Sequence, residues 1–349
     1  GLEEFKYITV RSVAFQFISL ILLFVFVRSK DDYLKYAGIS VVSSVGSNIC
    51  NFIHARHFVD FKIKARNLKK HLKPVFTLFA MSAAVSIYTV LDTTMLGFIK
   101  GDEAVGIYTA ATKINRMVIM MITAATAVLL PRLSYYADKD RNEFLRLANK
   151  AVQFVVMFSV PCAAGLFILS EPAVLLFSGE QFLPAVPVMK IMNAVIVFIG
   201  ISNVIGIQIF MSVGKERYTL FSVIVGAAVN FAMNMIFIPH FGAIGAAVGT
   251  VCAEFSVTAI QFAWARKYFA FENLIVHFFK VLLSLLVMSV CVSCVCRYFK
   301  AYSVELFLGI LSGVLIYSLC LFVLKDSLFV EISNQLLGRF YKNNQKEAR

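Results

Sequence analysis

The sequence predicts an all-α, polytopic membrane protein with ten transmembrane helices. Hydrophobic residues make up 60% of the 349 residues and charged residues only 15%, and the mean hydropathy is +0.80. Ordinary soluble domains carry about 25% charged residues. In addition, apolar stretches of about 20 residues, the length that one span requires, recur along the chain. Both observations indicate that lipid surrounds most of the protein.

The apolar stretches are joined by short connections and account for most of the chain. Pro74 is expected to open the third span, where a missing N–H costs nothing. Pro131 and Pro239 are expected to close the fourth and seventh spans, and Pro161 to kink the fifth. The expected spans are 7–27, 34–55, 75–99, 104–130, 149–169, 186–212, 218–238, 243–264, 274–296 and 303–324.

The basic residues lie mainly on one side of these spans. The net charge is +13, and if residue 1 is cytosolic, 22 Lys and Arg fall in inside segments against 6 in outside turns. This asymmetry predicts that both ends of the segment are cytosolic. Because the basic residues are spread over several loops, nucleic-acid binding is the weaker explanation.

The chain contains two basic, amphipathic segments, a linker between two groups of spans and a C-terminal tail. We interpret residues 1–56 as the last two spans of an N-terminal lobe and 57–73 as a cytosolic amphipathic linker. Residues 74–264 form a six-span C-terminal lobe, 265–325 add two spans, and 326–349 form a cytosolic amphipathic tail. Both amphipathic segments are expected to lie on the membrane surface. Their apolar faces include Phe61, Ala65, Leu68 and Leu72 in the linker and Leu328, Phe329, Ile332, Leu336, Leu337 and Phe340 in the tail.

Three charged side chains within the lobe predict a transporter. Asp92 lies in the third span, and Lys113 and Arg116 lie on one face of the fourth at i, i+3 spacing. A charge at membrane depth costs about 2.5–3.5 kcal/mol, so it is kept mainly where it faces water, a partner or a substrate. Pairing between Asp92 and Lys113 that merely holds helices together is the structural alternative.

Four stretches of the sequence are specific enough to compare with known families. They are residues 1–12 (GLEEFKYITVRS), 86–118 (SIYTVLDTTMLGFIKGDEAVGIYTAATKINRMV), 129–139 (LLPRLSYYADK) and 238–254 (IPHFGAIGAAVGTVCAE). Together they resemble the oligosaccharide and polysaccharide flippases (O-antigen transporters) of the multidrug/oligosaccharidyl-lipid/polysaccharide exporter superfamily. The ten spans are similar to spans five to fourteen of a fourteen-span, two-lobed fold. The resemblance therefore implies that the segment is truncated at its N-terminus, as a start at Gly1 also suggests.

The resemblance implies a function and a substrate. Such a protein flips a lipid-linked (polyprenyl-diphosphate) oligosaccharide across the cytoplasmic (inner) membrane by alternating access, during surface polysaccharide biosynthesis. Lys113, Arg116 and Arg11 are our candidates for meeting the diphosphate in a cationic cavity. The implied partners are the lipid-linked oligosaccharide, membrane lipids, a polysaccharide polymerase and a chain-length regulator.

A second group of polar residues is a candidate for ion coupling. In the lipid II flippase branch, a sodium site takes an acid from one span, two polar residues at i, i+4 from another and a hydroxyl from the next. Asp92, Asn230, Asn234 and Thr250 occupy similar places, although the branch has an acid at the position of Asn234. Glu254 is a further candidate and would carry a proton. Sodium or a proton is thus the expected coupling ion, and interhelical hydrogen bonding by buried Asn is the alternative.

Two other functions stay open at this point. A cation-coupled exporter of drugs or small molecules would share the fold. A membrane polysaccharide polymerase or ligase would need a long outward loop with Arg and His, whereas the five histidines lie at span ends or in the linker. We therefore expect no enzyme activity and no acid–base pair. The seven cysteines lie within predicted spans, where helix packing explains Cys291, Cys294 and Cys296 better than a metal does.

Overall fold

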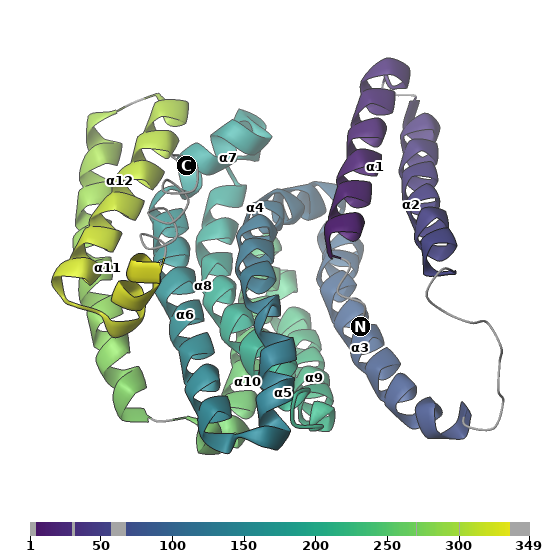
Figure 1. Cartoon of the computed structure of the whole chain (residues 1–349). Helices are drawn as coiled ribbons and strands as arrows, with labels where there is room; N and C mark the ends of the chain where they lie inside the picture. Colours follow the sequence, from purple (N-terminus) through teal and green to yellow (C-terminus); the bar gives the residue numbers. More distant parts are fainter. Residues whose placement is uncertain (1–4, 30–31, 57–67, 270, 300, 336–349) are drawn as a thin grey trace, which may run out of the picture. The chain divides into compact units, whose positions relative to one another are not determined.

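The computed structural model describes the chain except for residues 1–4, 30–31, 57–67, 270, 300 and 336–349. The described residues are helical and contain no β-strand (Figure 1). They divide into two compact units, Gly1–His71 and Leu72–Arg349, and each unit is described by itself. The predicted all-α class is confirmed.

In the first unit, α1 (Phe5–Phe26) and α2 (Tyr33–Ala55) pack as an antiparallel pair. The hydroxyl group of Tyr7 donates to the Cys50 carbonyl oxygen at 3.2 Å, and Ser43 Oγ donates to the Phe15 carbonyl oxygen at 3.2 Å. The turn between the helices is held by Asp32, whose Oδ2 accepts hydrogen bonds from two backbone N–H groups at 3.0 Å each. Residues 57–67 of the predicted linker lie outside the described residues.

The second unit is a bundle with α8 (Ala185–Asn203) near its middle. This helix packs against α4 (Asp102–Ala127), α6 (Arg141–Ile168) and α10 (Ala243–Ala265), and α10 also packs along α9 (Glu216–Phe241). The long α3 (Leu68–Lys100) leads into α4. The short elements are α5 (Leu129–Lys139), α7 (Ser170–Ser178), η3 (Glu180–Phe182), the π-helix η4 (Val204–Phe210) and η5 (Arg266–Tyr268).

A final helix pair covers one side of this bundle. Helices α11 (Phe271–Tyr298) and α12 (Tyr302–Val323) pack on each other, α11 contacts α6, and α12 contacts α7. These helices correspond to the two additional spans expected at 265–325.

Eight helical segments among the described residues are long and apolar enough to cross a membrane. They coincide with eight of the ten expected spans. The other two, 34–55 and 75–99, fall on α2 and α3, which are helical over 23 and 33 residues. The multi-pass membrane architecture is therefore confirmed.

Two of the four prolines, Pro74 and Pro239, do not mark helix ends as we expected. Helix α3 begins at Leu68, so Pro74 lies beyond its first turn and does not open it. Helix α9 continues past Pro239 to Phe241, and the chain turns at Gly242, whose φ of +55° favours glycine. Pro131 follows the end of α4 and lies in the first turn of α5, while Pro161 lies inside α6.

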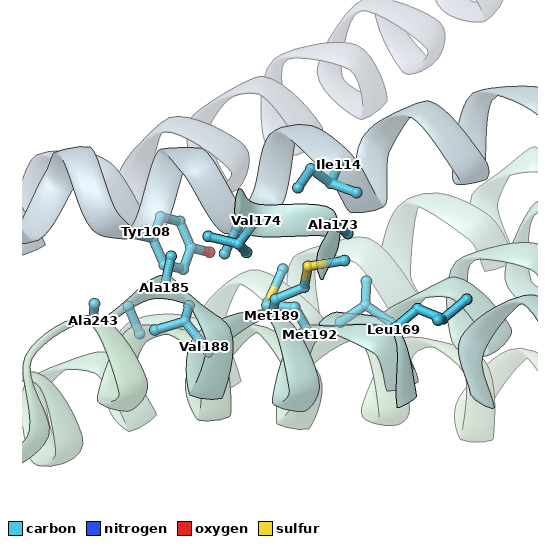
Figure 2. Close-up of a cluster of buried hydrophobic side chains, with 14 of the residues drawn as sticks. Tyr108, Ile114, Leu169, Ala173, Val174, Ala185, Val188, Met189, Met192 and Ala243 are labelled. Carbon is cyan, nitrogen blue, oxygen red and sulfur yellow. The ribbon is translucent and has the colours of Figure 1, made fainter. Parts of the chain in front are cut away.

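The largest buried cluster joins nine helices of the second unit, and Figure 2 shows part of it. Tyr108 and Ile114 of α4 face Ala173 and Val174 of α7 and a row of small and flexible side chains on α8. Ala243 contributes from the start of α10. The alanine and valine side chains of the cluster allow α4, α8 and α10 to approach closely enough for polar side chains on them to meet.

The start of the tail packs on protein. Residues 327–335 are helical, Leu328 is only 6% exposed, and Phe329 and Ile332 pack against the buried cluster. We expected this apolar face to lie on the membrane surface. For these residues the expectation is wrong, because side chains of the helix bundle cover the face. Leu336, Leu337 and Phe340 lie outside the described residues.

Candidate functional site

The carboxylate of Asp92 is the centre of a buried polar cluster in the second unit. Asp92 lies on α3, eight residues before its end at Lys100, and only 3% of it is exposed. Its Oδ1 accepts a hydrogen bond from Asn230 Nδ2 at 2.9 Å and another from Asn234 Nδ2 at 2.7 Å. Both asparagines are fully buried on one face of α9, as their i, i+4 spacing predicts.

The second carboxylate oxygen faces two hydroxyl groups. Oδ2 of Asp92 accepts a hydrogen bond from Thr250 Oγ1 at 2.7 Å and another from the Tyr108 hydroxyl group at 2.8 Å. The two hydroxyl oxygens are themselves 3.0 Å apart. Thr250 comes from α10 and Tyr108 from α4, so side chains of four helices, α3, α4, α9 and α10, meet at one carboxylate.

All four donors are neutral, and this decides between two interpretations of Asp92. The structural alternative was an ion pair with Lys113, but within the described part of the chain Asp92 forms no salt bridge. Four hydrogen bonds satisfy the carboxylate oxygens without a neighbouring cation. The cluster therefore combines one acidic side chain with polar groups that carry no charge.

The same side chains fit a hard monovalent cation in their chemistry. Asn230, Asn234, Thr250, Tyr108 and Asp92 together supply amide, hydroxyl and carboxylate oxygens, the ligand type that hard cations prefer. Asn234 Oδ1 is buried and forms no hydrogen bond among the described residues, whereas its Nδ2 also donates to Asn230 Oδ1 at 3.1 Å. Rotation of the two amides would turn their oxygens toward the carboxylate.

Gly249 leaves room for the unpaired amide oxygen. A Cβ atom built at this position would collide with Asn234 Oδ1. A glycine in α10 is therefore what allows Asn234 to point inward from α9, and the small residues that we assigned only to helix packing also shape the cluster.

Glu254 lies one turn beyond Thr250 on α10, but it is separate from this cluster. Only 4% of Glu254 is exposed, and within the described residues its carboxyl group forms no salt bridge or hydrogen bond. An isolated carboxylate is costly to bury in an apolar bundle. The environments of Asp92 and Glu254 are thus opposite, one rich in donors and the other without them.

Of the three candidate diphosphate contacts, two lie on an exposed helix face and Arg11 is partly buried. Lys113 and Arg116 are exposed on α4, whose buried face carries Tyr108 and Asn115, and neither cation forms an ion pair among the described residues. In the first unit, the Arg11 guanidinium carbon lies 5.7 Å from the centre of the Tyr7 ring. Its Nε and Nη1 atoms have no hydrogen-bond partner in the described residues.

Two contributors were missed at the sequence level. Tyr108 was not singled out, although it is a polar aromatic residue within a span, and such a hydroxyl group usually finds a partner when buried. Asn115 Nδ2 donates to Asn193 Oδ1 at 3.0 Å, which joins α4 to α8 below the Asp92 cluster. Polar residues on the buried face of a predicted span could have indicated both.

The fold, with its buried polar cluster, is that of a helical, multi-pass membrane protein. Comparison with known proteins agrees with this class. A family described as "Polysaccharide biosynthesis protein" matches residues 1–137, and the "MatE" family matches residues 78–236. The predicted resemblance to polysaccharide exporters is confirmed.

Related proteins are named as transporters or flippases. The chain is 25% identical over 272 residues to a "Putative O-antigen transporter" of Escherichia coli, covering 76% of this chain and 65% of that protein. It is 24% identical over 166 residues to the "Probable flippase AglR" of Haloferax volcanii, covering 47% of this chain and 35% of that protein. These names agree with the expectation of a transporter, not an enzyme.

A solved structure shares the fold. The "Lipid II flippase MurJ, inward closed conformation" superimposes with a TM-score of 0.69 at 20% identity, covering 90% of this chain and 66% of that protein. The chain therefore spans slightly less than two thirds of the length of the Escherichia coli relative and of this flippase.

Proposed function

We propose that the protein containing this chain flips a lipid-linked (polyprenyl-diphosphate) oligosaccharide across the cytoplasmic membrane during surface polysaccharide biosynthesis. The observation that carries the proposal is the pair of exposed cations Lys113 and Arg116 within the span formed by α4. Their charges are costly at membrane depth, and neither forms an ion pair with another residue that the structure describes. A diphosphate is a ligand that both cations would bind.

The names of the relatives support this substrate class. The Escherichia coli relative is named for O-antigen transport and the Haloferax relative as a flippase. The inner-membrane location, cytosolic chain ends and a polymerase or chain-length regulator as partners belong to the same proposal. Arg11, which lies in the first unit, is a further proposed contact of the diphosphate.

In this proposal Asp92, Asn230, Asn234 and Thr250 hold the coupling ion, sodium or a proton. Because these residues come from α3, α9 and α10, exchange of their hydrogen bonds changes how the three helices are held together. An ion drives transport only if the inward- and outward-open states bind it with different affinity. Tyr108 would orient the carboxylate through its hydroxyl group.

The test is complementation of a flippase-deficient strain by the full-length protein with Lys113→Ala or Arg116→Ala. We expect at least a tenfold loss of surface polysaccharide, with membrane abundance within about twofold of wild type, because neither side chain holds the fold together. The control is Lys190→Ala, which removes a cation from another span and should leave polysaccharide near normal. If both α4 variants complement fully, the diphosphate role is wrong.

A second candidate function is a cation-coupled exporter of drugs or small molecules. It is favoured by the "MatE" match, which covers the cluster residues Asp92, Asn230 and Asn234 but ends before Thr250. This function predicts that expression raises the resistance of a sensitive strain to cationic drugs and leaves surface polysaccharide unchanged in the flippase-deficient strain.

A further inference from the structure

The segment after α12 reverses direction and is fixed to the bundle within a few residues. Lys325 adopts a positive φ of 48°, and the Asp326 N–H group donates to the Leu321 carbonyl oxygen at 3.0 Å. Asp326 Oδ1 then accepts a hydrogen bond from the Phe329 N–H group at 3.1 Å and so caps the helix formed by residues 327–335. In Figure 1 this segment lies beside α11 and α6.

His277 of α11 joins this cap to α6. Its Nδ1 atom lies 2.8 Å from Asp326 Oδ2, and its Nε2 atom lies 3.0 Å from the Gln153 carbonyl oxygen. The side chains of His277 and Asp326 are only 3% and 1% exposed. The expectation that no acid–base pair is assembled is therefore wrong for His277, because Asp326 reaches it across 49 residues of sequence.

The two hydrogen bonds fix the number of protons. A carbonyl oxygen and a carboxylate both accept, whereas a neutral imidazole has only one N–H group. Both bonds can form only if the His277–Asp326 pair holds one proton more than a neutral imidazole and a carboxylate do. This count is the same whichever of the two residues carries the additional proton.

The groups around Asp326 favour its ionised form. Burial raises the pKa of Asp326, but the hydrogen bonds from His277 and the Phe329 N–H group and the nearby charge of Lys280 outweigh it, so the pKa is lowered overall. The Asp326 carboxylate is therefore the hydrogen-bond acceptor of the pair.

The helices that pack around the His277–Asp326 pair, α6, α11 and α12, carry other titratable groups near it. On α11, Lys280 Nζ donates to the Lys325 carbonyl oxygen at 2.9 Å. On α6, Lys150 forms an ion pair with Glu331 at 2.6 Å, a second anchor of the same helix. Tyr317 of α12 faces Asp326, and Cys162 of α6 faces Tyr317.

We propose that His277 is a proton-binding site that docks the C-terminal segment onto α6 and α11, so that docking weakens as the pH on that side of the membrane rises. Release of the segment takes Asp326 away and leaves the imidazole on α11 without its partner, and an unpaired imidazole is largely neutral above about pH 6.5. The docked state thus binds the additional proton more tightly and is favoured at lower pH. At the acid limit, docking is lost again as the pH falls through the lowered pKa of Asp326.

The test is hydrogen–deuterium exchange of residues 327–335 in the full-length protein in lipid nanodiscs, between pH 6 and 8.5. After correction for intrinsic exchange, we expect wild-type protection to fall by up to tenfold per pH unit in the upper part of this range, since one proton is released. His277→Gln should show low protection without this slope. His240→Gln, at an exposed histidine of α9, should behave like wild type.

A second variant distinguishes loss of the proton-binding site from a loss of docking that does not depend on pH. Lys150→Ala breaks the ion pair with Glu331 and should lower protection at every pH while keeping the slope, because it leaves the His277–Asp326 pair in place. Peptides from α8 report whether each variant is folded. Constant wild-type protection from pH 6 to 8.5, or an unchanged slope in folded His277→Gln, would overturn the proposal.

Discussion

At the scale of single residues, the sequence contained most of the buried cluster but not its full geometry. Asp92 stands out as a charge in an apolar run, and the i, i+4 spacing of Asn230 and Asn234 places both on one face of α9. Their convergence with Thr250 was expected only by resemblance, and the structure brings all four together. Tyr108 was not predictable in the same way, because one tyrosine in a span resembles ordinary filler until its neighbours are known.

Substitution of Asp92 tests the coupling role. In proteoliposomes, Asp92→Asn should abolish transport driven by a sodium or proton gradient, because the amide has no charge to attract either ion. Tyr108→Phe removes one of four hydrogen bonds, costs about 1 kcal/mol of stability and should retain gradient-driven transport. The charge-swapped pair Asp92→Lys, Lys113→Asp should not restore transport, because Asp92 bonds to neutral groups. Full gradient-driven transport by Asp92→Asn would refute the role.

At the scale of elements, hydropathy predicted where helices exist but not where they end or what covers them. Eight apolar stretches became helices of spanning length because the bilayer requires about 20 apolar residues. The docking of 327–335 depends on contacts distant in sequence, which periodicity does not contain. The start of α3 at Leu68, six residues before Pro74, was not predicted either. The tail has the same amphipathic pattern whether lipid or protein covers it.

The hairpin of α9 and α10 gives an element-scale prediction. A Cβ atom at Gly245 would collide with the backbone carbonyl group of Phe237 at the end of α9, and backbone atoms cannot move aside as a side chain does. Gly245→Ala should therefore destabilise the protein by about 1–3 kcal/mol. Gly165→Ala in α6 meets no atom within 4 Å and should be neutral or slightly stabilising. Thermal unfolding in detergent compares the two, and equal midpoints would contradict the prediction.

At the scale of the whole molecule, aromatic and basic side chains gather at one end of the second unit's bundle. Tyr218 and Trp264 have ring centres 4.8 Å apart, and Phe144 and Tyr268 5.8 Å apart. Lys215 Nζ lies 3.4 Å from the Tyr268 hydroxyl oxygen. These residues lie at the start of α6 and α9 and the end of α10, as expected for side chains at a membrane interface.

The orientation of that end is the last prediction. The 22 to 6 distribution of basic residues predicts that residues 57–73, the 131–148 region and the tail are cytosolic. Single cysteines introduced at Lys69 and Lys139 should thus resist a membrane-impermeant maleimide in intact cells and react once the membrane is opened. A cysteine at exposed Gln181, in the connection between α7 and α8, should react from outside. The reverse labelling pattern would show that the protein has the opposite membrane orientation. The His277 proton site would then lie on the outer side.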